Sequence, residues 1–346
     1  QRPASGEPVF DFSGGTPPLD FVNTVSSRCC DGERDLLGEY RDLVAWGRQA
    51  ELIDKPRAAA LRRIAGIADQ NSGRLTLLGV APEPPMLQRL LQQPNLVDQL
   101  IEAERDELDK KLHRWADHDA AGAECVVDVG DPALTIIRRV LDHQHDLVVV
   151  TTDEDREDHA TIRRLLRKCP CPVWVIRPTR ATTQKVMAAI NPEPDEAELN
   201  RTILELASSM VRIGGGELHV IHAWELYGES TKRTSSFMHI QPTDLEGMVE
   251  RAHQNHEQAV VDTLQAAGVA DEPWQIHVVK GHAADVIPDA VSHHRINLLV
   301  MGTVARTGIG GLVMGNTAER VLDRVSRSFI AVKPPGFVSP IHLPSA

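Results

Sequence analysis

An internal repeat constrains the fold of this chain more than any other feature. A helical stretch that begins after Gly130 leads to the apolar run 146–151, and a similar stretch after Gly281 leads to the run 297–302. Corresponding positions of the two segments are 151 residues apart. Self-similarity at one long, fixed spacing indicates a duplicated domain, so the chain is expected to fold as two related units in tandem.

The two copies differ in length near their ends. Each closes with a short apolar strand followed by a basic residue and a proline, at 173–178 and at 329–334. There the spacing is 156 residues, so the first copy is five residues shorter just before its last strand. In that segment the second copy has a glycine-rich loop and the first has the acidic stretch 153–158. Because carboxylates repel phosphate, we expect no phosphate group to bind in the first copy.

Short, almost entirely apolar strands alternate with helices in both copies. This pattern predicts an α/β fold of two tandem doubly wound parallel sheets, each of five-strand type, with the first copy incomplete. The first copy has an expected helix at 58–70. In the second copy, strands are expected at 185–190, 217–223, 274–279, 298–301 and 329–332, and helices at 197–211, 245–267, 284–293 and 316–325.

The glycine-rich loop of the second copy has the composition of a phosphate site. An apolar strand runs into Gly302, and Gly315 stands directly before the expected helix. Such a loop brings backbone N–H groups up to a phosphate at a helix N-terminus. The spacing resembles the signature of the universal stress protein family, which is Gly, two residues, Gly, nine residues, Gly, then Ser or Thr. Here Ala305 replaces the second glycine and Asn316 replaces the hydroxyl residue.

The resemblance implies a nucleotide site at the carboxyl ends of the strands in the second copy, with ATP as its ligand and without a metal. Asn191 stands where nucleotide-binding members carry an aspartate that holds ribose, and the loss of that charge weakens the contact. The methyl group of Ala305 resists any positive φ where backbone passes the phosphate. The residues assigned to the site are Ala189, Asn191, Ala223, Met301, Gly302, Ala305, Gly315, Asn316 and Thr317.

The resemblance divides the chain into a first domain at 58–180, without a glycine loop, and a second at 181–346. In tandem members of the family the last strands of the two copies pair within one chain. The strands at Val173 and Phe329 are therefore expected to lie antiparallel in an intramolecular pseudo-dimer. The alternative is two independent domains on a linker, which the short segment 177–184 disfavours.

Residues 1–57 form a segment of different origin. The string from Phe12 to Thr24 and the helix-like run 36–47 resemble the N-terminal part of stress-induced transcription regulator-like proteins. Those proteins end in a zinc finger with a Cys-Gly-Asn-Arg string, which this sequence lacks, so DNA binding is not carried over. By the repeat, the first strand of the first copy falls near 42–47, where the apolar spacing favours a helix and leaves a strand as the alternative.

Composition excludes several function classes. The formal net charge is −12, which makes nucleic acid an unexpected partner. No apolar stretch approaches the roughly 18 residues of a membrane span, and the first residues lack a signal-peptide core. The five cysteines lack metal-ligand spacing, which favours a reducing cytoplasm.

Catalytic chemistry is sparse in the sequence. We find no nucleophile and no paired general acid and base, and paired histidines such as His253 with His256 are expected on solvated helix faces. The function predicted is a non-enzymatic stress-response module that binds a nucleotide or another small ligand, with no protein partner identifiable. The alternatives are a stress-linked transcriptional regulator that contacts its partner through residues 1–57, and a slow ATP hydrolase in which Glu319 positions water.

Overall fold

The computed structural model describes residues 25–26, 34–35, 55–70, 72–83, 94–151, 159–177, 184–228, 242–303 and 314–342. The chain divides into two compact units, Gln1–Leu77 with Lys111–Cys125 and Leu78–Lys110 with Val126–Ala346. Within the described residues, no helix combines the length and the apolar character needed to cross a bilayer.

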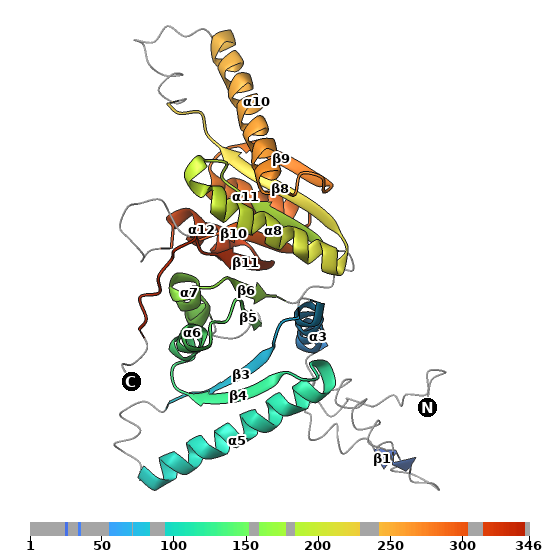
Figure 1. Ribbon diagram of the computed structural model, residues 1–346, viewed down its shortest axis with the longest axis vertical. Coiled ribbons are helices and arrows are strands. Elements are labelled where there is room, and N and C mark those ends of the chain that lie inside the picture. Colours follow the sequence, from blue (N-terminus) through green and yellow to red (C-terminus); the bar gives the residue numbers. More distant parts are fainter. Residues whose placement is uncertain are drawn as a thin grey trace. The chain divides into compact units, whose positions relative to one another are not determined.

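A seven-stranded sheet forms the centre of the second unit (Figure 1), with the strand order β5-β6-β11-β10-β7-β8-β9. The second copy supplies five adjacent strands of it, all mutually parallel, as the alternation of apolar strands and helices predicts. These strands are β7 (Lys185–Ala189), β8 (Glu217–Trp224), β9 (Trp274–Lys280), β10 (Leu298–Gly302) and β11 (Ser328–Val332).

Four helices of the second copy cover the two faces of these strands. Helices α8 (Ala197–Gly214) and α10 (Pro242–Ala266) contact each other and one face, and α11 (Ala283–His293) and α12 (Asn316–Arg324) contact each other. Alternate strand residues such as Met187 and Leu299 pack into one core cluster with residues of α11 and α12. Burial on both faces explains why the strands read as continuous apolar runs. Every expected element of this copy is confirmed within a few residues.

The last strands of the two copies pair with each other, as expected. Strand β6 (Val173–Ile176) runs antiparallel to β11, with Val175 opposite Phe329 and Trp174 opposite Ile330. Beyond β6, the parallel strand β5 (Val148–Thr151) completes the sheet. Residues Val175 and Ile330 are fully buried, so this junction is part of the core rather than a linker contact.

Polar contacts cross the same junction. In α7 (His159–Lys168) of the first copy, Arg163 forms a 3.0 Å ion pair with Asp323 of α12. The backbone N–H of Arg177, just after β6, donates to the Ser328 hydroxyl over 3.0 Å. These contacts fix the register in which the two copies meet.

The remaining strands of the first copy form a separate sheet, which differs from the expected single sheet per copy. Strands β3 (Thr76–Ala81) and β4 (Glu124–Val129) pair only with each other among the described strands. The bonds Glu124 N–H to Leu75 O and Gly130 N–H to Ala81 O run in the same order along both strands, so the pair is parallel. The segment 42–47, where the repeat places another strand, lies outside the described residues.

The other described elements belong to the first copy and the N-terminal segment. Helix α3 (Lys55–Gln70) confirms the helix expected at 58–70. Helix α5 (Pro94–Asp119) lies between β3 and β4 in the chain, and α6 (Pro132–His143) follows β4. The two-residue strands β1 (Val25–Ser26) and β2 (Arg34–Asp35) pair antiparallel. The predictions for 12–24 and 36–47 lie outside the described residues.

Candidate functional site at the carboxyl ends of the second-copy strands

The sheet of the second copy has a topological switch point between β7 and β10. From β7 the chain proceeds outward through β8 to β9, and it then returns to the other side of β7 to form β10 and β11. The connections that follow β7 and β10 therefore leave in opposite directions, and a crevice between them is expected from this topology. In parallel α/β sheets, ligands bind in this crevice beyond the carboxyl ends of the strands.

Strand register brings several predicted site residues to this crevice. Ala189 is the direct neighbour of Met301 on β10 and of Ile221 on β8. Asn191 lies two residues after Ala189, and Ala223 lies two residues after Ile221. Both therefore stand further toward the same carboxyl edge of the sheet. Ala189 and Met301 are both buried as whole residues.

The helix that follows the glycine-rich loop opens beside the end of β10. The backbone N–H of Gly315 donates to the Thr303 carbonyl over 2.9 Å, and α12 begins at the next residue, Asn316. Gly315 is the N-cap residue and supplies no side-chain cap, so the first N–H groups of α12 lack a side-chain acceptor there. Thr317 is half-buried and Asn316 is exposed. Ala305 and the rest of the loop at 304–313 lie outside the described residues.

Gly302 has a structural role that the loop pattern did not indicate. A Cβ atom at this position would lie 2.8 Å from Cδ2 of Leu199 on α8. Contacts that short do not occur between real side chains, so a larger residue would displace Leu199. The packing of α8 on β10 is therefore one reason for a glycine here, beside any contact with a ligand.

A pair of asparagines holds the connection after β7. The amide of Asn200 on α8 donates to the Asn191 carbonyl over 2.7 Å, and its Oδ1 accepts from the Asn191 N–H over 3.3 Å. Asn200 is 1% exposed. The sequence analysis missed this residue, although an amide beside Leu199 on the apolar side of a helix is a recognisable signal. It positions Asn191 at the crevice through the backbone.

A buried histidine pair lies near the same edge. In β8, Nε2 of His222 lies 2.9 Å from Nδ1 of His256. The other ring nitrogen of His222, Nδ1, lies 3.4 Å from the Ile190 carbonyl oxygen. Burial, with a smaller effect from His256, lowers the pKa of His222 to about 4. The Trp224 ring stacks on His256 with centroids 4.9 Å apart. The expectation of a solvated face is therefore wrong for His256, because α10 packs its imidazole against the polar end of β8.

Glu319 is tied to the first copy. Its carboxylate forms an ion pair with Arg167 of α7. The sequence analysis considered this carboxylate for positioning water, but its partner lies on the neighbouring copy.

Known proteins resemble this chain in sequence. The sequence profile of the Universal stress protein family matches residues 54–177 and again residues 182–333. Over 224 residues, the chain is 29% identical to universal stress protein E of Escherichia coli K12, covering 61% of this chain and 68% of that protein. It is 24% identical over 253 residues to the universal stress protein E homolog of Haemophilus influenzae, covering 70% of this chain and 80% of that protein.

Solved structures show the same fold. A functionally unknown protein from Pseudomonas aeruginosa PAO1 superposes with a TM-score of 0.55 at 24% identity, covering 80% of this chain and 88% of that one. A universal stress protein from Archaeoglobus fulgidus gives a TM-score of 0.53 at 16% identity, covering 81% and 95%. The chain belongs to the universal stress protein family and carries two copies of its domain in tandem.

Proposed function

We propose that this tandem universal stress protein binds one nucleotide, with ATP as the candidate, at the carboxyl edge of its second copy and performs no chemistry on it. The observation that carries the proposal is the placement of the α12 N-terminus, led by Gly315, beside the end of β10 at the switch point. Backbone N–H groups and the helix dipole at such an end favour a phosphate.

The individual roles follow from position along the edge. The N–H groups of Asn316 and Thr317 hold phosphate, and the backbone at Met301 and Gly302 lies beside ribose and phosphate. Asn191, held by Asn200, meets the ribose hydroxyls. A neutral amide accepts these hydrogen bonds less strongly than a carboxylate, so the affinity for ATP is lower than an aspartate at position 191 would give.

The two copies have different tasks in this proposal. Residues 181–346 form the binding domain, and residues 58–180 form a domain without a nucleotide that completes an intramolecular pseudo-dimer through β6 and β11. The pairing of Val175 opposite Phe329 supports this arrangement. Residues 1–57, with their resemblance to transcription regulator-like proteins, are a separate segment. The sulfur atoms of Cys169 and Cys171 lie 3.6 Å apart without forming a disulfide, which suits a cytoplasmic location.

Binding without hydrolysis is preferred over the alternative of a slow hydrolase. The carboxylate proposed to position water, Glu319, is paired with Arg167. That ion pair holds the carboxylate toward α7 and gives it a structural role at the junction.

Titration calorimetry with ATP tests the proposal. We expect one site per chain, and Gly315→Val should raise the dissociation constant at least about tenfold because a branched side chain would crowd the phosphate. The backbone at Gly315 has φ −64°, which valine adopts, and because this residue is buried, a melting curve of the variant verifies that it is folded. Gly247→Val is the matched control and should bind like the parent, because among the described residues only the Arg251 side chain lies within 4 Å of a Cβ at this position of α10.

The converse variant restores the pattern of the family. Ala305→Gly combined with Asn316→Ser should strengthen ATP binding. Unchanged affinity in Gly315→Val, or two equivalent sites per chain, would contradict the proposed site. No gain from the double change would point to a ligand other than ATP.

A further inference from the structure

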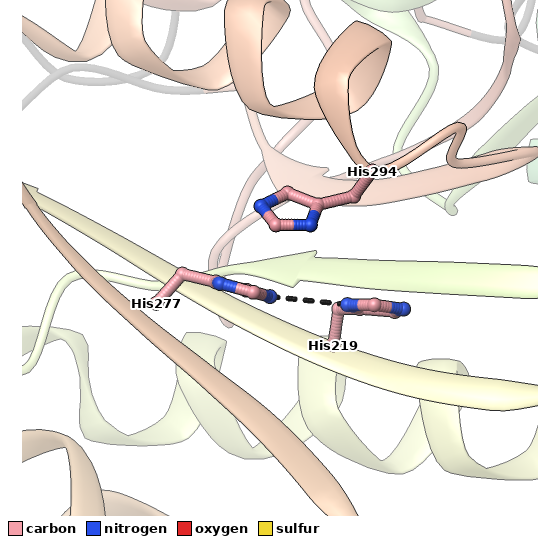
Figure 2. Close-up of side chains that lie close together, drawn as sticks. All are labelled: His219, His277 and His294. Atoms are coloured by element: carbon pink, nitrogen blue, oxygen red, sulfur yellow. Dashed lines mark hydrogen bonds between the residues drawn. The ribbon is translucent and has the colours of Figure 1, made fainter.

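Three histidines from separate elements converge at the edge of the second-copy sheet (Figure 2). His219 lies near the start of β8, His277 lies in the edge strand β9, and His294 follows α11. Each offers one ring nitrogen, and these three atoms all lie within 4.8 Å of one another. Nδ1 of His219 is 3.0 Å from Nε2 of His277, and the His294 ring approaches that pair with its centroid 4.2 Å from that of His277.

Strand register explains why these rings meet. Ile221 of β8 is the neighbour of His277 on β9, so His219, two residues earlier, points to the same face of the sheet as His277. Ile221 packs in the core cluster with Ile287 and Val291 of α11. His294 is the C-cap residue of that helix, so its backbone is fixed where the helix ends over this face.

One polar atom in the cluster has no hydrogen bond. The His219 side chain is 2% exposed, and its Nε2 is buried without a hydrogen-bond partner among the described residues. Oε2 of Glu217 lies 3.6 Å from this Nε2 and is itself held by Lys185 at 2.9 Å. If Nδ1 of His219 donates its lone pair to a metal, the proton resides on Nε2 and faces this carboxylate. A carboxylate behind a histidine is the usual second partner of a metal-binding imidazole.

We propose that His219, His277 and His294 bind a divalent transition metal of the zinc class, with Glu217 orienting His219. Three imidazole nitrogens around Zn²⁺ at 2.0–2.1 Å stand about 3.3 Å apart in tetrahedral geometry. The 3.0 Å between Nδ1 of His219 and Nε2 of His277 is close to this spacing, and all three ligand atoms lie within 4.8 Å of one another. His277 and His294 are half-buried, so the fourth position faces solvent, as in zinc sites that hold a water molecule.

This site is separate from the proposed nucleotide site. His219 is the third residue of β8, and His294 precedes the first residue of β10 by four positions, so both lie toward the amino ends of the strands. The glycine-rich loop follows the carboxyl end of β10. Metal binding at this site therefore does not depend on ATP binding at the other.

Zinc binding to tag-free, full-length protein provides the test. In a competition titration with a chromogenic chelator, we expect one Zn²⁺ ion per chain to bind more tightly than any further Zn²⁺ ion on the same chain. His277→Ala and His294→Ala should each lower the zinc affinity by more than about 100-fold, which exceeds the loss typical of residues that do not ligate the metal. Glu217→Gln should lower the zinc affinity by about tenfold. His293→Ala removes an exposed neighbour of His294 and should leave the affinity unchanged.

Cobalt substitution gives a second readout. Bound Co²⁺ should show the intense visible absorption of a four-coordinate site in the parent and in His293→Ala, and lose it in His277→Ala. Circular dichroism verifies that each variant is folded. Equal zinc affinity in the parent, His277→Ala and His294→Ala would overturn the proposal and leave the three rings as a hydrogen-bonded packing cluster.

Discussion

The two copies are alike in the half that contains the repeat and different in the half before it. Gly130 and Gly281, 151 residues apart, have φ values of 147° and 142°. Gln144 and Arg295, at the same spacing, both have φ 55°. In each copy the glycine leads into a helix and then into the last two parallel strands. The duplication has therefore kept the backbone turns that set the direction of the chain.

The difference lies in which sheet the strands join. In the second copy β7, β8 and β9 continue the sheet beyond β10, whereas in the first copy β5 and β6 join the sheet of the second copy, and β3 and β4 pair apart from it. An apolar strand such as β11, left at an edge, would invite aggregation. Pairing β11 with β6 removes that edge. The first copy has no glycine-rich loop in its sequence, and yet its last strand completes the core of its neighbour.

The largest expected effect comes from a charge in the junction between the copies. Val175→Lys would bury an unpaired ammonium opposite Phe329 and should cost about 3–5 kcal/mol of unfolding free energy. Urea denaturation measures the cost, and small-angle scattering reports whether the copies separate. Val279→Lys, on the edge strand β9 at 38% exposure, is the control and should cost little. Native stability and an unchanged scattering profile in Val175→Lys and in Ala331→Asp would refute the core role of this junction.

A smaller effect concerns acid sensitivity, which we expect to originate in the second copy. The folded pKa of His222, about 4, is below its ordinary value of 6.5, so between these values the unfolded chain binds a proton that the folded chain does not. This stabilisation is fully present above pH 6.5 and is lost as the pH falls toward 4, by on the order of 3 kcal/mol. His222 faces His256, and the titratable groups that face His256 in turn are His253 and Glu193.

Denaturation at several pH values checks this prediction. His222→Asn should reduce the slope between pH 6.5 and 4 without removing it, because burial also lowers the pKa of His277 to about 4. His118→Asn, on the exposed side of α5, should keep the full slope. Equal slopes in the parent and in His222→Asn would show that other groups cause the acid sensitivity.

The smallest effect compares the matched glycines directly. Alanine at either position must adopt a φ near 145°, which costs about 1–3 kcal/mol. At Gly281 the new Cβ would also lie 2.9 Å from Cγ2 of Val286, against 3.1 Å from the Thr135 hydroxyl at Gly130. We therefore expect Gly281→Ala to lower the melting temperature more than Gly130→Ala. A larger loss of melting temperature in Gly130→Ala would mean that the first copy tolerates a side chain at this glycine less well than the second copy does.

The chain order of the elements could be predicted from the sequence because each signal is local. Apolar runs bounded by helical stretches mark the strands of the second copy, and Gly315 marks the start of α12. The antiparallel pairing of β6 and β11 followed from the family resemblance and is confirmed. The placement of residues at the carboxyl edge followed from the rule for parallel sheets.

Contacts between distant elements were decided only by the tertiary structure. The sequence shows His219, His277 and His294 as three unrelated histidines; they meet because β8, β9 and the end of α11 are neighbours in space. Asn200 can form its hydrogen bond with Asn191 only when α8 packs on β7. Gly302 packs closely against Leu199, and Glu319 is held by Arg167 of the other copy. Periodicity and turn chemistry reside in neighbouring residues, so the sequence alone determined the order of the elements. Side-chain contacts, and the division of the first-copy strands between two sheets, depend on packing and register across the whole molecule, so only the tertiary structure decided them.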